Sequence, residues 1–261
     1  MDPLTELDWA AHWKGLVEAR NRRRVEPRRG DFWDARAARF ARSIGRQEDP
    51  FWKFLEPRLR PTQTVIDVGA GVGRHTIPLA GRVDWVTAVE PSAGMRQQIP
   101  PLPNVTVIGS SWEDAEPAPA DLVICVHVLY GVPDPAPFLE KLDRSARERV
   151  FVVLRDSERM LLADRLAAVE RPREPLLRDC FLLLRQLGIP PDVTMYRYPT
   201  RTLYDSLEEA AEECRDVLGQ DWDEERGRAW LETNLRAQED GTLLYEAGEV
   251  TAGVLHWKPA S

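Results

Sequence analysis

Three features that are typical of particular classes of protein are scarce or absent in this sequence: cysteines, long apolar runs and a signal peptide. It contains only three cysteines in 261 residues, and the wide spacing of Cys125, Cys180 and Cys214 predicts neither a disulfide framework nor a metal site. No apolar run approaches the roughly 20 residues that a membrane span needs. The first residues lack the basic and apolar stretches of a signal peptide. We therefore expect a cytoplasmic protein with no metal and no membrane partner.

Charge is plentiful but unevenly spread along the chain, whose net charge is -8. Residues 20–29 hold six arginines, and residues 205–225 hold ten acidic residues. An arginine cluster can contact a phosphate backbone, but it is more often a solvated helix end, and here the acidic segment could pair with it. Because the chain is acidic overall and no aromatic residues interleave the arginines, nucleic-acid binding is not favoured.

Residues 64–155 alternate between short apolar runs and helical segments, which is typical of a parallel, doubly wound α/β sheet. The expected strands are Val65–Val68, Trp85–Glu90, Val105–Ile108, Leu122–His127 and Arg149–Leu154, and the helices between them are expected to start near Gly73, Ser92, Glu113 and Asp134. Beyond residue 155 we expect helices over 157–170, 176–187 and 206–238, and strands over 193–198 and 250–257.

A glycine-rich turn indicates the kind of ligand. Residues 64–73 read TVIDVGAGVG, an apolar strand that breaks into G-x-G-x-G, and the next strand ends at Glu90. Such a unit binds a nucleoside. A dinucleotide site needs a small residue where Arg74 stands, and Asp67 would repel a pyrophosphate. A ligand with ammonium and sulfonium groups suits Asp67 better, so NAD, or a turn without any ligand, is the disfavoured alternative.

At these residues the chain resembles the class I S-adenosylmethionine (SAM)-dependent methyltransferases of the small-molecule type, whose first motif is an acid followed by G-x-G-x-G. The resemblance implies a three-layer α/β/α Rossmann-like fold with a seven-stranded, mostly parallel sheet, whose last hairpin carries one antiparallel strand. It also implies SAM as the methyl donor and S-adenosylhomocysteine as the product. We expect a helical cap or lid in residues 1–60 and a SAM-binding domain in residues 61–261, with helical insertions near 156–190 and 203–240.

The resemblance implies roles for single residues at the strand ends. Glu90 is placed to accept hydrogen bonds from the ribose hydroxyls, and Asp67 suits the methionyl amino group. The turn after the third strand would hold adenine through Trp112 and Glu113, with core packing as the alternative for Trp112 and also for Met95. The complete set of expected cofactor-binding residues is Asp67, Gly69, Ala70, Gly71, Gly73, Glu90, Pro91, Met95, Ser111, Trp112, Glu113, Cys125, Trp33 and Arg36.

Residues 31–40 resemble the W-D-x-R-A-x-x-F segment that forms a lid over the cofactor in many small-molecule methyltransferases. This implies that Arg36 contacts the SAM carboxylate and that Trp33 and Phe40 line the pocket. The alternative is an amphipathic helix that docks on the edge of the sheet.

The fourth strand ends in residues 125–130, the position under the transferred methyl group in this family. The segment lacks the D/N-P-P-Y sequence of amide and adenine N-methylation, which weakens a nucleobase or glutamine as the substrate. His127 is the candidate general base, because imidazole takes up a proton near neutral pH; the alternative is a histidine that shapes the pocket or binds the SAM carboxylate. Tyr130 is a weaker catalytic candidate of the same kind.

We therefore expect a methyltransferase that uses SAM to methylate an oxygen or nitrogen of a small molecule. Two alternatives stay open. One is RNA methylation with Arg20–Arg29 on the phosphate backbone, and the other is a SAM-binding protein that has lost catalysis. The sequence identifies neither the acceptor nor the oligomeric state.

Overall fold

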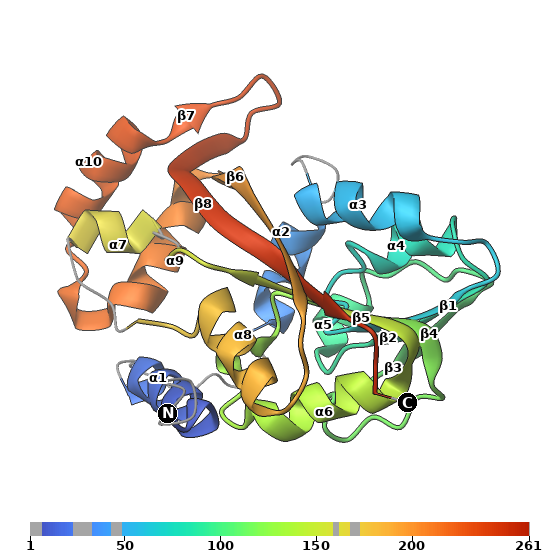
Figure 1. The fold of residues 1–261 in the computed structure, drawn as a ribbon. Helices are drawn as coiled ribbons and strands as arrows, with labels where there is room; N and C mark the ends of the chain where they lie inside the picture. Colours follow the sequence, from blue (N-terminus) through green and yellow to red (C-terminus); the bar gives the residue numbers. More distant parts are fainter. Residues whose placement is uncertain (1–6, 23–32, 43–48, 159–161, 168–172, 261) are drawn as a thin grey trace.

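A mostly parallel sheet runs through the centre of the computed structural model, which describes residues 7–22, 33–42, 49–158, 162–167 and 173–260 (Figure 1). Its strands are β1 (Thr64–Val68), β2 (Trp85–Val89), β3 (Val105–Ile108), β4 (Ala120–Val126), β5 (Ala146–Arg155), β6 (Asp192–Tyr204), β7 (Arg236–Ala237) and β8 (Leu243–Trp257). They follow the order β3-β2-β1-β4-β5-β8-β6, and β7 pairs with β8. Strands β1 to β5 are parallel, whereas β8 is antiparallel to both of its long neighbours. This confirms the expected fold class. The short β7 is an additional strand, and it lies in the last part of the segment 206–238, which was wrongly expected to be helical to its end.

The helices agree with the expected segments in most places. They are α1 (Trp9–Arg22), α2 (Ala37–Arg42), α3 (Pro50–Leu55), α4 (Thr76–Ala80), α5 (Ala93–Arg96), α6 (Pro135–Ser145), α7 (Leu162–Ala167), α8 (Leu177–Gln186), α9 (Leu207–Leu218) and α10 (Glu224–Asn234). The helix expected from Glu113 is wrong, because residues 112–114 form only a turn. Pro117 and Pro119 follow directly, and a proline supplies no backbone N–H and disfavours helical backbone in the residue before it.

Alternate residues of the central strands face two separate cores, since successive side chains of a strand point to opposite faces. Ile66 and Val152 belong to a core that is completed by α1, α6 and α8. Their chain neighbours Val65 and Phe151 belong to another core, completed by α3 and α4. Figure 1 shows α6 and α8 on one face of the sheet and α3 and α4 on the other. Both faces of the parallel strands are therefore covered, as such strands require.

The long strands β6 and β8 extend beyond the parallel part of the sheet. Only Ala252–Trp257 of β8 pair with β5, so the first part of β8 lies past the end of that strand. There the two strands pack with α7, α9 and α10 into a third core (Figure 1). Its buried residues are Leu162, Ala163, Tyr204, Ala210, Ala211, Cys214, Leu231, Leu235 and Tyr245. We call this unit the cap.

The described helices within residues 7–60 do not gather in one place. Helix α1 contributes Trp13 and Val17 to one core of the sheet, and α3 contributes Phe51 and Leu55 to the other. Between them, α2 packs near the start of α5. The predicted division into an N-terminal cap and a SAM-binding domain therefore stays a prediction. Among the described residues, no helix combines the length and apolarity needed to cross a lipid bilayer.

Candidate active site

The glycine turn after β1 combines close packing with open backbone. Gly69, Gly71 and Gly73 have φ angles of 70°, 56° and 84°, a region that L side chains rarely adopt. A Cβ atom on Gly69 would lie 2.4 Å from Val128 Cγ2, just beyond the end of β4. A Cβ atom on Gly71 would meet no atom within 4 Å. Gly69 thus lets the chain approach β4, whereas Gly71 leaves the backbone accessible from one side.

Glu90 ties the end of β2 to this turn. Its Oε2 accepts a hydrogen bond from the Gly71 amide at 2.8 Å, and its Oε1 accepts one from the Ser92 amide at 2.8 Å. The side chain is buried, and this burial raises the pKa of the Glu90 carboxyl above its ordinary value, against the effect of the two amide donors. The turn and the acid that the sequence places 19 residues apart are therefore in direct contact.

Asp67 connects β1 to the start of α4 in the same way, by a hydrogen bond of its carboxylate. It is buried, and its Oδ2 accepts a hydrogen bond from Thr76 Oγ1, at the start of α4, at 2.7 Å. Burial raises the pKa of Asp67. The next two residues after the turn, Arg74 and His75, both contact Asp49 at 3.0 Å. His75 is buried there and, as the N-cap residue of α4, makes no side-chain capping hydrogen bond.

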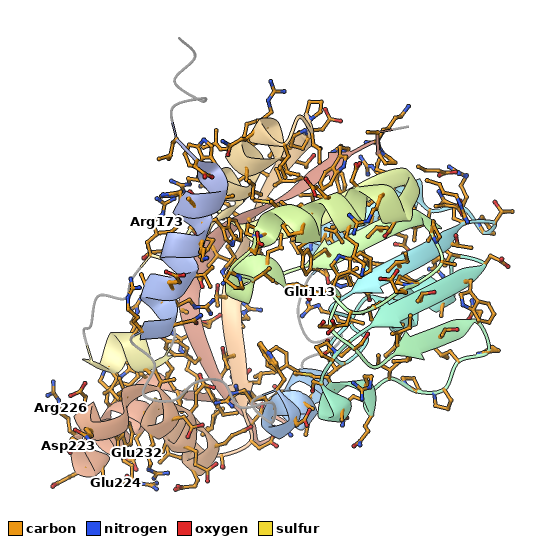
Figure 2. All side chains as sticks on the ribbon, turned by 90° about the horizontal axis from the view of Figure 1, so that it is seen from below. Glu113, Arg173, Asp223, Glu224, Arg226 and Glu232 are labelled. Carbon is orange, nitrogen blue, oxygen red and sulfur yellow. The ribbon has the colours of Figure 1, made fainter. Side chains whose placement is uncertain are left out.

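The turn after β3 separates its residues into buried and accessible ones. The Trp112 indole is buried in the core below the turn, where its Nε1 donates to the Phe138 carbonyl at 3.3 Å. Ser111 Oγ donates to Asp114 at 2.7 Å. Glu113 is exposed and lies beside α6 (Figure 2). At this turn, a ligand can therefore reach the side chain of Glu113 but not that of Trp112.

Met95 and Cys125, two further expected cofactor residues, are buried. Met95 packs with Ala37 and Val72, between α2 and the glycine turn. Cys125 lies in β4 between Val68 and Val152 of the neighbouring strands, and burial raises the pKa of its thiol well above the ordinary value. The Cys125 thiol is thus enclosed in the sheet core.

The end of β4 carries an unusual backbone conformation. His127 has a φ of 59°, and it is the only non-glycine residue with a positive φ among the described residues. Such outliers need support from their surroundings. The His127 Nδ1 atom lies 2.9 Å from the Tyr130 hydroxyl, which accepts a hydrogen bond from the Arg155 amide at 2.7 Å. The hydroxyl has one proton and two acceptor lone pairs, so it can donate to Nδ1 or accept from it, according to the tautomer of the imidazole.

Three charged residues that sequence reasoning missed at this site surround Tyr130. The guanidinium of Arg155 lies 4.1 Å from the Tyr130 ring centroid and 2.6 Å from Glu174. Arg20 donates to the Tyr130 carbonyl at 2.7 Å and lies 3.7 Å from Glu174. Burial raises the pKa of Tyr130, so the phenol stays protonated at neutral pH. Arg155 ends the fifth strand, and that position at a carboxyl end was a usable signal; nothing in the sequence marks Glu174.

Residues 33–42, which we call the lid segment after the role expected for residues 31–40, bridge the glycine-turn region and the cap. Asp34 accepts hydrogen bonds from the Ser92 hydroxyl and the Gly94 amide at the start of α5. Arg36 lies 3.0 Å from Asp216 of α9, so in this structure it pairs with the cap. Arg39 and Arg42 contact the acidic residues Glu213 and Glu209 of α9 as well. Trp33 and Phe40 are in edge-to-face contact at 5.7 Å, and residues 31–32 lie outside the described residues.

These contacts correct one expectation about charge. The acidic segment 205–225 pairs with Arg36, Arg39 and Arg42 and with Arg215 and Arg228. Of the cluster at residues 20–29, only Arg20 and Arg22 are described; Arg20 turns to Tyr130, and Arg22 lies 3.9 Å from Glu18. For these two arginines, pairing with the acidic segment was the wrong expectation.

Asp67, the glycine turn, Glu90 and His127 all lie at the carboxyl edge of the parallel strands, next to the point between β1 and β4 where the strand order reverses. Open α/β sheets bind ligands at this point. Among the described residues, no group of three or more His, Cys, Asp or Glu side chains could hold a metal ion. A nucleoside-type glycine turn on a sheet with this strand order and an antiparallel β8 defines a class I SAM-dependent methyltransferase.

The chain belongs to the methyltransferase-domain family, whose family model, described as "Methyltransferase domain", matches residues 35–186. SAM is the methyl donor of this class of enzyme. No curated protein matches the chain.

Solved structures share the fold at low sequence identity. A proposed methyltransferase from an antibiotic biosynthesis pathway of Anabaena variabilis is 16% identical with a TM-score of 0.52, over 84% of this chain and 97% of that one. Magnesium protoporphyrin IX methyltransferase from Synechocystis is 16% identical with a TM-score of 0.50, over 86% and 96%. At these identities the likeness concerns the fold alone.

Proposed function

We propose that this SAM-dependent methyltransferase transfers the methyl group to an oxygen or nitrogen atom of a small molecule. The observation that carries the proposal is the position of Arg20. This first arginine of the basic cluster points into the protein, towards the Tyr130 carbonyl and Glu174, and so joins the surroundings of His127. An arginine held in this way is not available to an RNA backbone. Ion pairs between the lid segment and α9 join the glycine-turn region to the cap.

The glycine-turn region supports a specific placement of the cofactor. A carboxylate oxygen offers about two lone-pair directions, so Glu90 can accept from ribose hydroxyls while it keeps the Gly71 and Ser92 amides. Asp67 supplies negative charge for the methionyl amino group. The open side of Gly71 leaves room for the ligand to approach the backbone.

The other expected cofactor residues stay proposals with narrower roles. Because the Trp112 indole and the Cys125 thiol are buried, we assign them contacts through the backbone only. Glu113 is the accessible acid for the adenine amine, with Ser111 next to it. We also keep five further residues as proposed cofactor contacts: Ala70, Gly73, Pro91, Met95 and Trp33. Arg36 would reach the SAM carboxylate only by leaving Asp216.

The hydrogen bonds of His127 refine its role. We propose that the Tyr130 hydroxyl donates to Nδ1, so that the imidazole proton lies on Nε2. Such an Nε2 atom donates a hydrogen bond and takes up no proton from the acceptor. We therefore propose that His127 orients the acceptor or the cofactor, and that the acceptor atom has a free lone pair at neutral pH. Methyl transfer discharges the sulfonium, so alignment in a dry site supplies most of the rate enhancement.

The test is a transfer assay with SAM that carries a tritiated methyl group. The enzyme is incubated with a metabolite extract and, separately, with total RNA. We expect label in the low-mass fraction. Label in RNA would overturn the small-molecule proposal and favour the RNA alternative. SAM binding with no label in either pool would favour the non-catalytic alternative.

A calorimetric titration tests the cofactor placement. Replacing Glu90 with Ala removes hydrogen bonds to a charged acceptor, each worth about 1.5–3 kcal/mol, so SAM affinity should fall ten-fold or more. Unchanged affinity would remove the ribose assignment.

A further inference from the structure

A cavity lies at the end of the strands opposite the candidate active site. Its volume is about 720 Å³, and its lining includes Arg147 and Arg149 at the start of β5 and Lys258 just after β8. Figure 1 shows the C-terminal end of the chain on this side of the sheet, away from the cap. Arg149 and Arg155 are six residues apart on β5, which corresponds to about 20 Å. The cavity is therefore separate from the candidate active site.

The lining of this cavity is strongly cationic. It has five cationic side chains, Arg58, Arg60, Arg147, Arg149 and Lys258, against one acid, Glu148. This excess of positive charge occurs in a chain whose net charge is -8. Arginine and lysine clusters of this kind attract multiply charged anions.

The acidic residues near the cavity neutralise only part of this charge. Glu148 is occupied by Arg60, at 2.6 and 2.7 Å, and also accepts a bond from Gln63. Arg147 is 3.7 Å from Asp121 and Arg149 is 3.9 Å from Asp192, both longer than hydrogen bonds. Within the described part of the chain, Arg58 and Lys258 make no ion pair with a carboxylate. Their positive charges are therefore not neutralised by the protein and can attract an anionic ligand.

Aromatic residues hold part of the cationic wall in place. The guanidinium of Arg58 stacks on the Phe54 ring at 3.8 Å from its centroid. Arg149 donates to Nδ1 of His256 at 2.9 Å, and the His256 ring lies 5.4 Å from that of Phe54. Phe151 adds an apolar side chain to the lining. A concave site with apolar walls and a few fixed charged groups is typical of small-ligand sites.

We propose that this cavity binds a small molecule that carries adjacent phosphate groups, such as a pyrophosphate or the polyphosphate of a nucleotide. Arginines that reach one cavity from η3 (Glu56–Arg58) and from β5 match neighbouring phosphates, which each accept bidentate hydrogen bonds. A nucleic-acid strand fits less well, because Glu148, Asp121 and Asp192 interrupt the positive surface around the cavity.

Inorganic tripolyphosphate is the probe for this site, measured by calorimetry at fixed ionic strength. The wild-type chain should bind it. The double variant Arg58→Gln with Lys258→Gln should weaken binding ten-fold or more. The control Arg236→Gln removes an exposed arginine of β7, in the cap, and should bind as the wild type does. SAM affinity reports on folding and should be equal in all three proteins, so this test does not depend on the proposed acceptor.

Three outcomes would overturn the proposal. One is no tripolyphosphate binding by a wild-type chain that binds SAM. Another is equal weakening in the double variant and in Arg236→Gln, which would show general attraction between charges. The last is tight binding of a short single-stranded RNA that tripolyphosphate fails to displace, which would make the surface a nucleic-acid site.

Discussion

The two halves of the candidate active site are built in different ways. The glycine-turn half joins residues of one βαβ unit: Glu90 contacts Gly71 across 19 positions, and Thr76 contacts Asp67 across 9. The strand-end half, around His127 and Tyr130, depends on distant segments, since Arg20 is 110 positions from Tyr130. The first half can form wherever this unit folds, whereas the second exists only when α1, β4 and β5 are assembled. We expect mutations in the two halves to separate cofactor binding from turnover.

The largest effect should come from Gly69→Ala, compared with Gly71→Ala. An alanine at Gly69 adds a clash with Val128 to an unfavourable φ. The left-handed backbone costs about 1–2 kcal/mol and overpacking about 1–3 kcal/mol, so the free energy of unfolding should fall by several kcal/mol. Gly71→Ala incurs only the backbone cost, but its Cβ enters the space proposed for SAM, so SAM affinity should fall more than stability does. Denaturant unfolding and calorimetry measure both, and equal profiles for the two variants would contradict this separation.

The next effect concerns His127 in the strand-end half. If His127 acts as a donor through Nε2, then His127→Gln keeps a donor amide and should retain turnover within about three-fold, whereas His127→Ala should lose about ten-fold, the value of one hydrogen bond. SAM affinity should change little in either variant. A general base would behave differently, because Gln cannot take up a proton and a loss of about 10²-fold or more would follow. Steady-state kinetics with the identified acceptor decide between these roles.

A smaller effect is expected from pH in the glycine-turn half. Burial raises the pKa values of Asp67 and Glu90, so in the free protein each carboxyl favours its protonated form more than it does in the unfolded chain. Each therefore stabilises the free protein below its ordinary pKa, and this stability is lost as pH rises through the raised value. If Asp67 and Glu90 hold SAM as proposed, binding needs both carboxylates charged, so SAM affinity should rise several-fold as pH increases above 4.5, the ordinary pKa of Glu90.

Glu90→Gln is the matched variant for this pH experiment. It removes one titrating group, so the slope of SAM affinity against pH should become shallower. Affinity that falls as pH rises over this range would contradict the assignment of Asp67 and Glu90 to the cofactor.

The smallest effect should come from the ion pairs of the lid segment. Arg39 pairs with Glu213 of α9, and both side chains are partly exposed. Exposed pairs contribute about 0.2–1 kcal/mol, so Arg39→Gln should weaken SAM binding about two- to five-fold and should make it less sensitive to salt. Arg215→Gln is the control, because Arg215 pairs with Glu208 and Glu224 within the cap. If both variants respond alike, the lid contacts have no special part in binding.

The difference between the halves also explains what could be predicted from the sequence. Strands β1 to β5 and the contact between Glu90 and the turn follow from local patterns, and the structure has both. The absence of a helix at Glu113 also follows from local sequence, because Pro117 and Pro119 disfavour helical backbone there. Arg20 and Glu174 could not be predicted, because their place beside Tyr130 follows from how α1 and the segment before α8 pack. Neither the roles of the site residues nor the acceptor follows from strand order.

Continuity of β8 constrains how the protein can move. The same strand pairs with β5 in the sheet and supplies Tyr245 to the core of the cap, so the cap cannot rotate as an independent body without bending that strand. Helix α2 spans only six residues, and its described contacts with the cap are those of its arginines: ion pairs, and the Arg39 guanidinium 5.7 Å from the centroid of the Tyr204 ring. We therefore expect entry of SAM and release of product to require displacement of the lid segment while the cap stays fixed. Turnover would then depend on how often those few charged contacts separate.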